Sequence, residues 1–453
     1  MGLAVRPASE KMGANRASPD SRPASSNASI VPPSMRIRMA LSSPASAAID
    51  ITSRPWLSII GIGEDGIEGL SPIARRLIGD AVVVVGGARH LALAGSIVSG
   101  ERLVWPSPIE AAFPRIVALR GSPVVILASG DPFHFGIGKQ LAAIVTPQEF
   151  VCMPQPSAFS LVAAQLGWAL QDVRTVSLHG RALASVIRHL QPGARVLSLS
   201  WDGSTPGKLA QLLCSRGLSD TRMTVLENMG GPGERVQHTT AKAGVAGDIG
   251  ALNTIALEVI AGADSRISTL APGRNDASFE NDGQLTKREV RAITIAALEP
   301  HHAELLWDIG LGSGSIAIEW LLCDPSLQAI GIEENAARAA IAARNAASLG
   351  TPELRIVHGR APEALQGLPT PDAVFIGGGL GDGVLDHAWR ALKPGGRMVA
   401  NAVTLQAEST LLNAFQQLGG ELSRIEVARA DSIGGMHGWR PAFPITQWRA
   451  VKS

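Results

Sequence analysis

A glycine-rich turn between two apolar runs constrains the fold of this chain more than any other stretch. Residues 305–309 are mostly apolar, which is typical of a strand buried on both faces, and the apolar residues within 316–322 predict a helix. The turn between them contains Gly310, Leu311, Gly312, Ser313 and Gly314. Glycine allows a left-handed turn and lets the backbone approach a ligand closely. Because the spacing departs from the G-x-G-x-x-G of dinucleotide-binding folds, it predicts a site for a different nucleotide.

A carboxylate ends the strand that is predicted next. Residues 329–332 form a short apolar run, and Glu333 follows them directly. At the end of the second strand of such a unit, a carboxylate is placed to accept hydrogen bonds from both hydroxyls of a ribose. The sequence therefore predicts an adenosine site.

Three later stretches extend this pattern in chain order: residues 359–365, 371–378 and 392–397. A glycine turn by itself also occurs in proteins without a ligand, so the assignment depends on all four stretches together. Together they resemble the class I S-adenosylmethionine (SAM) methyltransferases. This resemblance implies a Rossmann-like α/β domain that binds SAM.

The composition points to a small-molecule enzyme. The chain has 453 residues, a net charge of +1, 45% hydrophobic residues and 17% charged residues. This charge balance gives no sign of a nucleic-acid partner, and no run approaches the ~20 apolar residues of a membrane span. The three cysteines form no C-x-x-C pair, so neither disulfides nor a metal site is expected. We expect a cytoplasmic protein without a membrane or nucleic-acid partner.

Residues 1–54 differ from the rest of the chain. They are rich in Ser, Ala, Pro and Arg and show little apolar periodicity, which predicts disorder. They lack the continuous apolar core of a signal peptide. A solvated tail, or a true start at Met35 or Met39, is favoured over a transit peptide.

The first half of the remaining chain predicts a second α/β module. Residues 57–60 run into a glycine turn, helical spacing follows at 70–78, and 81–85 and 124–128 read as strands. A helix is predicted at 158–166. These blocks resemble the class III methyltransferases that act on tetrapyrroles, which have two α/β lobes with the cofactor between them.

A class III module followed by a class I module resembles the precorrin-6Y C5,15-methyltransferase (decarboxylating) family of aerobic cobalamin biosynthesis. Residues 177–181, 286–291 and 361–365 carry this resemblance. It implies that the chain methylates precorrin-6Y at C5 and C15, releases the C12 acetate carboxyl as CO₂, and so forms precorrin-8X. It also implies SAM at two sites per chain and a homo-oligomer, with a tetramer built through the second domain.

The predicted organisation has four segments. Residues 1–54 form the extension, and residues 55–261 form a tetrapyrrole methylase domain to which the resemblance assigns C5 methylation. The polar stretch 262–281 is the predicted linker. Residues 282–453 form the class I domain, to which the resemblance assigns C15 methylation and decarboxylation.

The resemblance carries over to particular positions that would bind the cofactor. In the second domain these are Thr286, Asp308, Gly310, Leu311, Gly312, Ser313, Gly314, Glu333 and Ala361, with Asp308 anchoring the glycine turn. In the first domain they are Gly130, Asp131, Ser157 and Ala158. Because the methyl group of a sulfonium is already activated, transfer needs in-line placement more than acid–base help. The catalytic residues stay unknown at this stage.

Precorrins carry many carboxylates, so cationic and polar side chains near the sites are expected to hold the substrate. The candidates are His179, Arg181, Lys287, Arg291, Asn401 and Thr404. Each of these cations could instead be a surface charge or part of a structural ion pair. For Arg288 and Arg360 we expect such a structural role and not substrate binding. Three other functions remain open: action on a different tetrapyrrole, a non-catalytic role for one domain, and a nicotinamide-dependent oxidoreductase, which the glycine spacing disfavours.

Overall fold

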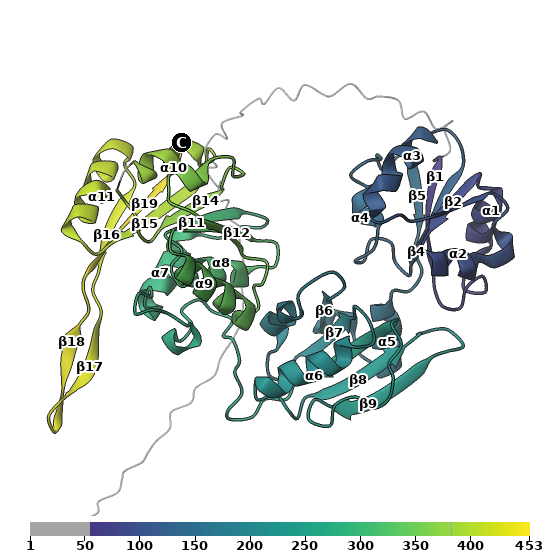
Figure 1. Ribbon diagram of the computed structural model, residues 1–453, viewed down its shortest axis with the longest axis horizontal. Helices are drawn as coiled ribbons and strands as arrows, with labels where there is room; N and C mark the ends of the chain where they lie inside the picture. Colours follow the sequence, from purple (N-terminus) through teal and green to yellow (C-terminus); the bar gives the residue numbers. More distant parts are fainter. Residues whose placement is uncertain (1–54, 382) are drawn as a thin grey trace, which may run out of the picture. The chain divides into compact units, whose positions relative to one another are not determined.

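The computed structural model describes residues 55–381 and 383–453, so the predicted N-terminal extension, residues 1–54, lies outside the described residues. The described chain forms a two-lobed α/β domain and then an α/β domain with one large sheet (Figure 1). The fold class predicted from the sequence is confirmed.

The first lobe is a five-stranded parallel sheet with the strand order β3-β2-β4-β1-β5. Its strands are β1 (Leu57–Ile62), β2 (Val83–Gly86), β3 (Glu101–Val104), β4 (Val124–Ser129) and β5 (Phe150–Met153). Its helices are α1 (Pro72–Asp80), α2 (Ala88–Ala94), α3 (Phe113–Ala118) and α4 (Gly138–Leu141), with short 3₁₀ turns η1 (Gly95–Ile97) and η2 (Ile109–Ala112). The strand predicted at 81–85 begins two residues later than expected, at Val83.

The second lobe is a mixed sheet with the order β6-β7-β10-β8-β9, in which only β6 and β7 run parallel. Its strands are β6 (Val173–Ser177), β7 (Arg195–Leu199), β8 (Arg222–Glu227), β9 (Arg235–Thr240) and β10 (Asn253–Glu258). Its helices are α5 (Ala158–Leu166) and α6 (Thr205–Ser215), with η3 (Leu170–Asp172) and η4 (Leu183–His189). Helix α5 has the bounds that the sequence predicts, because Ser157 caps its first turn and Gly167 ends it in a left-handed conformation.

The second domain is a seven-stranded sheet with the order β13-β12-β11-β14-β15-β19-β16, in which β19 runs antiparallel to both neighbours. Its strands are β11 (Leu305–Ile309), β12 (Gln328–Glu333), β13 (Arg355–His358), β14 (Ala373–Ile376), β15 (Arg397–Ala402), β16 (Glu421–Ile425) and β19 (Ile445–Val451). Its helices are α7 (Arg288–Leu298), α8 (Ser315–Cys323), α9 (Ala336–Leu349), α10 (Val384–Ala391) and α11 (Leu405–Leu418), with η5 (Asp276–Ser278) and η6 (Glu363–Leu365).

The central strands of this sheet are buried on both faces. In β11, Leu306 packs with residues of α7, α8 and α9, whereas Trp307 and Ile309 pack with residues of α10 and α11. Alternate side chains of a strand point to opposite faces, so helices must cover both faces of a strand that is apolar throughout. This three-layer arrangement explains the continuous apolar run at 305–309.

A two-stranded hairpin, β17 (Ala428–Ile433) and β18 (Met436–Pro441), interrupts the path from β16 to β19 and projects away from the seven-stranded sheet (Figure 1). Three of its large apolar side chains are exposed, namely Ile433, Met436 and Trp439. No motif in the sequence predicted this hairpin.

Part of the predicted linker packs against the second domain. The carboxylate of Glu319, which is fully buried in α8, accepts hydrogen bonds from the backbone N–H groups of Gly273 (2.6 Å) and Arg274 (2.9 Å). It also accepts a bond of 2.9 Å from Nε of Arg291 in α7. Residues 273 and 274 are therefore attached to α7 and α8 by a buried ionic cluster.

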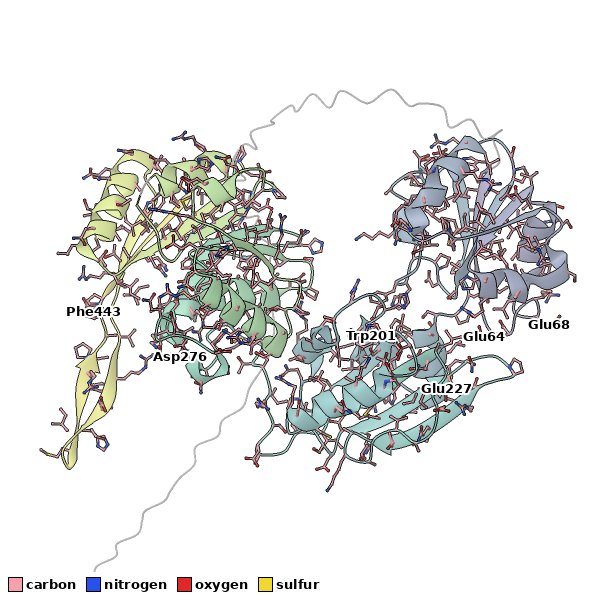
Figure 2. All side chains as sticks on the ribbon, in the orientation of Figure 1. Glu64, Glu68, Trp201, Glu227, Asp276 and Phe443 are labelled. Atoms are coloured by element: carbon pink, nitrogen blue, oxygen red, sulfur yellow. The ribbon has the colours of Figure 1, made fainter. Side chains whose placement is uncertain are left out.

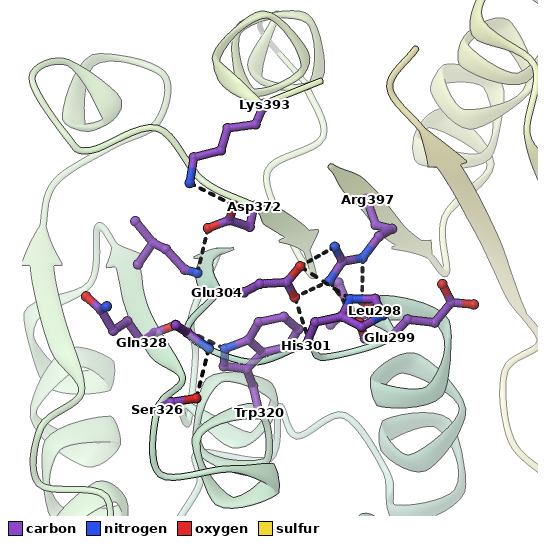
Figure 3. A network of polar contacts seen from close by, with 12 residues as sticks. Leu298, Glu299, His301, Glu304, Trp320, Ser326, Gln328, Asp372, Lys393 and Arg397 are labelled. Carbon is purple, nitrogen blue, oxygen red and sulfur yellow. Dashed lines mark hydrogen bonds and ion pairs between the residues drawn. The ribbon is translucent and has the colours of Figure 1, made fainter. Parts of the chain in front are cut away.

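A polar network closes the amino edge of the second-domain sheet (Figure 3). The Arg397 guanidinium at the start of β15 pairs with Glu304 and also donates to the carbonyl oxygens of Leu298 (2.9 Å) and Glu299 (2.8 Å). Burial would raise the pKa of Glu304, but the hydrogen bonds from Arg397 and from the backbone of His301 lower it overall. The network joins the end of α7 to the first residues of the central strands.

Candidate functional site

A cavity of about 1030 Å³ lies at the carboxyl edge of the second-domain sheet. The loops that follow β11, β12, β14 and β15 contribute to its wall, together with the base of the β17–β18 hairpin. Open α/β sheets bind ligands in the crevice outside the carboxyl ends of their strands. The residues of the sequence pattern at 305–334 therefore form one wall of this cavity.

The glycine turn is held where two loops touch. Gly310 has a φ of 75°, and a Cβ atom there would lie 2.9 Å from the backbone nitrogen and oxygen of Gly378 in the loop after β14. A side chain at this position would force the two loops apart. The requirement for glycine inferred from the sequence thus has a steric cause as well as a conformational one.

The Glu333 carboxylate ties the glycine turn to the end of β12. Its Oε2 accepts a hydrogen bond from the backbone N–H of Gly312 (2.8 Å), and its Oε1 accepts one from Asn335 (3.0 Å). The side chain lines the cavity, although the residue is only 5% exposed. Each carboxylate oxygen has a second lone pair, so both oxygens retain capacity to accept a hydrogen bond from a ligand.

Asp308 is a buried acid with an unused acceptor. Its Oδ2 accepts a hydrogen bond of 3.0 Å from the backbone of Ala317, whereas Oδ1 is buried without a partner among the described residues. Burial raises the pKa of Asp308 to about 7; the bond from Ala317 opposes this shift, and the nearby Glu333 carboxylate adds to it. A cation or a hydrogen-bond donor in the cavity would satisfy this acid.

Asn401 of β15 is fixed by two buried neighbours. Its Nδ2 donates to Oγ1 of Thr294 in α7 (3.0 Å), and its Oδ1 accepts from Nε2 of Gln447 in β19 (2.9 Å). Nε2 of Gln447 also donates to Thr294 (3.2 Å). These contacts fix the amide of a residue that lines the cavity. The Asn401 Nδ2 group has two hydrogens, and Thr294 accepts only one of them.

The cavity brings together most of the second-domain residues that the sequence singled out: Thr286, Lys287, Asp308, Gly310, Leu311, Gly312, Ser313, Glu333, Ala361 and Asn401. Thr286 and Lys287 lie directly before α7, whose first residue is Arg288. Gly314 lies outside the lining, directly before α8, and a Cβ atom there would lie 3.1 Å from Cβ of Ala342 in α9. Thr404 caps α11 by accepting from the N–H of Ala407 and is also outside the lining.

Arg291 does not line the cavity. It is fully buried, and its guanidinium donates to Glu319, to Asp276 (3.0 Å), and to the carbonyl oxygens of Thr286 and Arg274. The structural ion pair, which was the alternative for this residue, is therefore what the structure contains. Through the Thr286 carbonyl, Arg291 supports the loop that forms part of the cavity wall.

Several cavity residues were not found from the sequence: Glu289, Val403, Ile425, Val427, Arg429 and Phe443. Four of them flank or belong to the hairpin between β16 and β19. Their place in the wall depends on how this excursion leaves and rejoins the sheet, which no local pattern encodes. The only local signal in the sequence was the group of apolar residues around the Gly434–Gly435 pair, namely Ile433, Met436, Trp439 and Phe443, and it does not reveal which of them reaches the cavity.

The predicted cofactor positions of the first domain converge at the carboxyl edge of the first-lobe sheet. A Cβ atom on Gly61 would lie 1.8 Å from the carbonyl oxygen of Gly130, and one on Gly130 would lie 2.9 Å from Cα of Ser157. Ser157 then caps α5, which begins at Ala158. Asp131 follows Gly130, and its Oδ1 accepts from the N–H of Phe133 (2.8 Å).

A polar cluster that the sequence did not indicate surrounds Ser129, the last residue of β4. Nε2 of His90 lies 2.8 Å from Ser129 Oγ, and Nη2 of Arg89 donates to the same oxygen at 2.8 Å. Arg89 also forms an ion pair with Glu64. Burial, reinforced by the Arg89 charge, lowers the pKa of His90 to about 4, so this imidazole is neutral near pH 7.

His179 and Arg181 lie in the exposed loop after β6. The Arg181 guanidinium is 5.6 Å from the centre of the Phe135 ring, a distance typical of a cation–π contact. Phe135 is itself 44% exposed and has a φ of 62°, which is uncommon outside glycine. The structure thus joins Arg181 to the loop that begins at Asp131.

Two features are absent from the part of the chain that the structure describes. No helix there has both the length and the apolar character needed to cross a membrane. Within the same residues, no group of three or more His, Cys, Asp or Glu side chains is arranged to hold a metal ion.

Family comparisons agree with the two halves seen in the structure. Residues 57–243 match the tetrapyrrole (corrin/porphyrin) methylases, and residues 277–452 match the precorrin methyltransferase domain. The fold and these matches define a fusion of two SAM-dependent methyltransferase domains. Over 399 residues the chain is 57% identical to a precorrin-6Y C(5,15)-methyltransferase [decarboxylating] from Sinorhizobium sp., covering 88% of this chain and 97% of that relative. The chain belongs to the precorrin-6Y C(5,15)-methyltransferase (decarboxylating) family.

Two shorter relatives from Salmonella typhimurium carry one activity each in their names. A cobalt-precorrin-7 C(5)-methyltransferase is 32% identical over 180 residues, which are 40% of this chain and 88% of that relative. A cobalt-precorrin-6B C(15)-methyltransferase (decarboxylating) is 32% identical over 166 residues, which are 36% of this chain and 85% of that relative.

Proposed function

We propose that this chain methylates precorrin-6Y at C5 and C15 and removes the carboxyl group of the C12 acetate, which gives precorrin-8X. The observation that carries the proposal is the succession of a tetrapyrrole methylase domain and a precorrin methyltransferase domain in one chain that spans 97% of a 57% identical family member. The two shorter relatives support a division of labour. In this division the first domain methylates C5, and the second methylates C15 and decarboxylates.

The second-domain cavity suits a cationic nucleoside such as SAM. SAM carries a positive sulfonium and an amino group, and the cavity offers the buried carboxylates of Asp308 and Glu333. Glu333 would accept hydrogen bonds from the ribose hydroxyls, and the glycine turn leaves room for the methionine part beside Asp308. Bound SAM supplies an activated methyl group, so the residues of the chain have to position both reactants.

A second SAM would be held in the first domain by Gly130, Asp131, Ser157 and Ala158. The close contact of Gly130 with the loop before Ser157 supports this assignment, because the backbone of both loops is then available to one ligand. Two SAM sites per chain follow, one for each methylation.

Methyl transfer from a sulfonium needs little general acid or base catalysis from the chain. An electron-rich ring carbon attacks the sulfonium methyl in line, and orientation accounts for much of the rate. The conjugated macrocycle serves as the electron sink for loss of CO₂, while the cavity wall holds the substrate and excludes water. Lys287 and the fixed amide of Asn401 are the second-domain candidates for binding substrate carboxylates, and His179 and Arg181 are those of the first domain.

We also propose a homo-oligomer, a tetramer, that assembles through the second domain. The exposed apolar side chains of the β17–β18 hairpin support this, because Met436 and Trp439 are 75% and 77% exposed on a projecting element. Light scattering of the full chain should give four times the chain mass. A monomeric mass would contradict the proposal.

We propose that residues 262–281 link the two domains, and that the second half of this linker is attached to the second domain. Because Glu319 binds residues 273 and 274, limited proteolysis should cut first between 262 and 272. The two products should then be stable domains. Early cuts within 55–261 or 282–453 would argue against this boundary.

Product analysis tests the function. With precorrin-6Y and SAM, the full chain should give a product with two added methyl groups and one lost CO₂. The isolated first domain should add a single methyl at C5 without loss of CO₂. Any other mass change for the full chain would contradict the proposal, and calorimetry should find two SAM molecules per chain.

A further inference from the structure

The second-domain cavity has two ends of different chemistry. The glycine end, formed by Asp308, the turn from 310 to 313 and Glu333, is polar and carries two carboxylates. The opposite end, here called the hairpin-base end, is mostly apolar. Apart from one ion pair, it is lined by Val403, Ile425, Val427, Ala442, Phe443 and Ile445. The two ends therefore suit two different ligands.

Large apolar side chains at the hairpin-base end are exposed to solvent. Phe443 is 85% exposed and Val403 is 61% exposed. Phe443 lies at the base of the β17–β18 hairpin (Figure 2), and with Val427 and Ala442 it also lines a second hollow of about 570 Å³. Concentrated exposed apolar side chains of this kind mark a binding surface.

One ion pair crosses the hairpin-base end. Arg429 of β17 pairs with Glu289 of α7, and both side chains line the cavity. They are 48% and 43% exposed, and pairs that are this exposed contribute little net stability. A carboxylate that enters the cavity would therefore replace Glu289 at small cost. A guanidinium holds such a carboxylate through two parallel hydrogen bonds.

We infer that the hairpin-base end is the tetrapyrrole subsite of the second domain, an inference that rests on the proposed function. The macrocycle lies against the apolar wall that includes Phe443, and one of its peripheral carboxylates takes the place of Glu289 on Arg429. A methyl donor at the glycine end requires its acceptor in the same cavity, because transfer needs the two reacting atoms in line and in contact. A flat, partly apolar polycarboxylate is the ligand that matches both the wall and the charge.

The volume agrees with two ligands. Single small-molecule sites are typically about 300 to 1,000 Å³ in size. This cavity has about 1030 Å³, which is at the upper limit of that range, and the hollow of about 570 Å³ that shares Val427, Ala442 and Phe443 with it adds the space for a second ligand. A nucleoside at the glycine end leaves the hairpin-base end for the second reactant.

Two matched variants separate a substrate role of Arg429 from a structural one. Arg429→Gln and Glu289→Gln each break the same ion pair, but only the first removes the cation. The readouts are KM for precorrin-6Y in C15 methylation, measured at saturating SAM, and the dissociation constant of SAM by calorimetry. Arg429→Gln should raise KM by about ten- to a hundredfold without changing SAM affinity, whereas Glu289→Gln should leave KM unchanged or lower it.

Arg440 supplies a control on the same hairpin. It pairs with Asp431 at 2.8 Å and does not line the cavity, so Arg440→Gln should change neither readout. Equal losses in Arg429→Gln and Glu289→Gln would mean that the pair is structural, and they would overturn the inference. Unchanged SAM affinity shows that a variant has folded.

Phe443→Ala should raise KM by roughly tenfold, and Phe443→Leu should raise it less, with the molar mass of the protein unchanged. A change in molar mass with an unchanged KM would show that a second copy of the chain covers Phe443, and the inference would fail. If the wild-type chain forms no methylated product from precorrin-6Y, the proposed function itself fails. If the wild type is active but Arg429→Gln and Phe443→Ala keep its KM, only the subsite is wrong.

Discussion

The two edges of the second-domain sheet differ in how their acidic side chains are paired: Glu304 at the amino edge is partly buried, and Asp308 at the carboxyl edge is fully buried. At the amino edge, Glu304 meets the Arg397 guanidinium and a backbone N–H, and its pKa falls. At the carboxyl edge, Asp308 keeps one buried oxygen without a partner among the described residues, and its pKa rises to about 7. The Glu304 carboxylate thus finds its hydrogen-bond partners within the chain. The free oxygen of Asp308 can obtain one from a ligand in the cavity.

This difference separates the residues that maintain the fold from those that serve the reaction. A buried charge with a full set of partners fixes the start of several strands relative to each other. A buried charge without partners costs stability, and such groups concentrate at functional sites. Burial of an acidic residue therefore does not by itself indicate a ligand site. A buried acid that lacks a hydrogen-bond partner and lines a cavity does.

Breaking the amino edge should have the largest effect on stability. Arg397→Leu would leave the partly buried Glu304, whose side chain is 15% exposed, without its counter-charge. Removing one partner of a fully buried pair typically costs about 3 to 5 kcal/mol, which is the upper bound for this variant. Urea-dependent proteolysis, with second-domain fragments identified by mass, should show this loss. Lys393→Ala is the matched control, since its pair with Asp372 is more exposed and should cost at most about 1 kcal/mol. Similar losses in both variants would remove the distinction.

Glu333→Ala should give the largest functional effect at the carboxyl edge. Each charge-assisted hydrogen bond to a ribose hydroxyl contributes about 1.5 to 3 kcal/mol, so SAM affinity in the second domain should fall roughly tenfold to several hundredfold. Calorimetry should resolve this loss while the first-domain site stays intact. The product should then carry a methyl at C5 but none at C15.

The product mass of this variant carries further information. A singly methylated product that keeps its acetate would couple CO₂ loss to the second methylation, and a decarboxylated one would uncouple them. Glu333 also holds the backbone of Gly312 and Asn335, so Glu333→Gln, which keeps one acceptor, is the milder companion. Doubly methylated product at the wild-type rate under limiting SAM would contradict the ribose assignment.

Asp308 predicts a pH dependence of the opposite sign to that of Glu304. The native pKa of about 7 lies above the usual 3.8, so between these values the native state holds a proton that the unfolded chain has released. Asp308 therefore lowers the free energy of unfolding as pH rises from about 4 to 7. Asp308→Asn should remove this decline, on the order of a few kcal/mol, and should weaken SAM binding at pH 8.

Glu304 serves as the internal comparison for that measurement. Its pKa is lowered, so its stabilisation is present above the unfolded value and is lost as pH falls through the native value. Glu304→Gln should therefore cost stability at neutral pH and little in strong acid. If Asp308→Asn left the pH profile unchanged between 4 and 7, the buried acid would not titrate as proposed.

Features of the fold and the site that depend on neighbouring residues in the sequence could be predicted, whereas those that depend on contacts between distant segments could not. Strand β11, the glycine turn and Glu333 were predictable, because apolar runs and glycine spacing are local. The pairing of Arg291 with Glu319 was open at the level of sequence, since 28 positions separate the two residues. The hairpin-base wall and the Ser129 cluster were missed, because each depends on how distant segments meet at a sheet edge.

The smallest effects are expected behind the cavity wall, at the two residues that orient Asn401. Thr294 and Gln447 are almost completely buried, and neither lines the cavity, so they influence a ligand only through the Asn401 amide. Thr294→Val and Gln447→Leu each remove one of its partners. We expect each to lower kcat/KM for the C15 step by about three- to tenfold, with SAM affinity unchanged, because a neutral hydrogen bond contributes about 0.5 to 1.5 kcal/mol. Asn401→Ala should lower it at least as much, and adding Thr294→Val to Asn401→Ala should then cause no further loss. A full second loss in the double variant would show that Thr294 acts through the fold and not through Asn401.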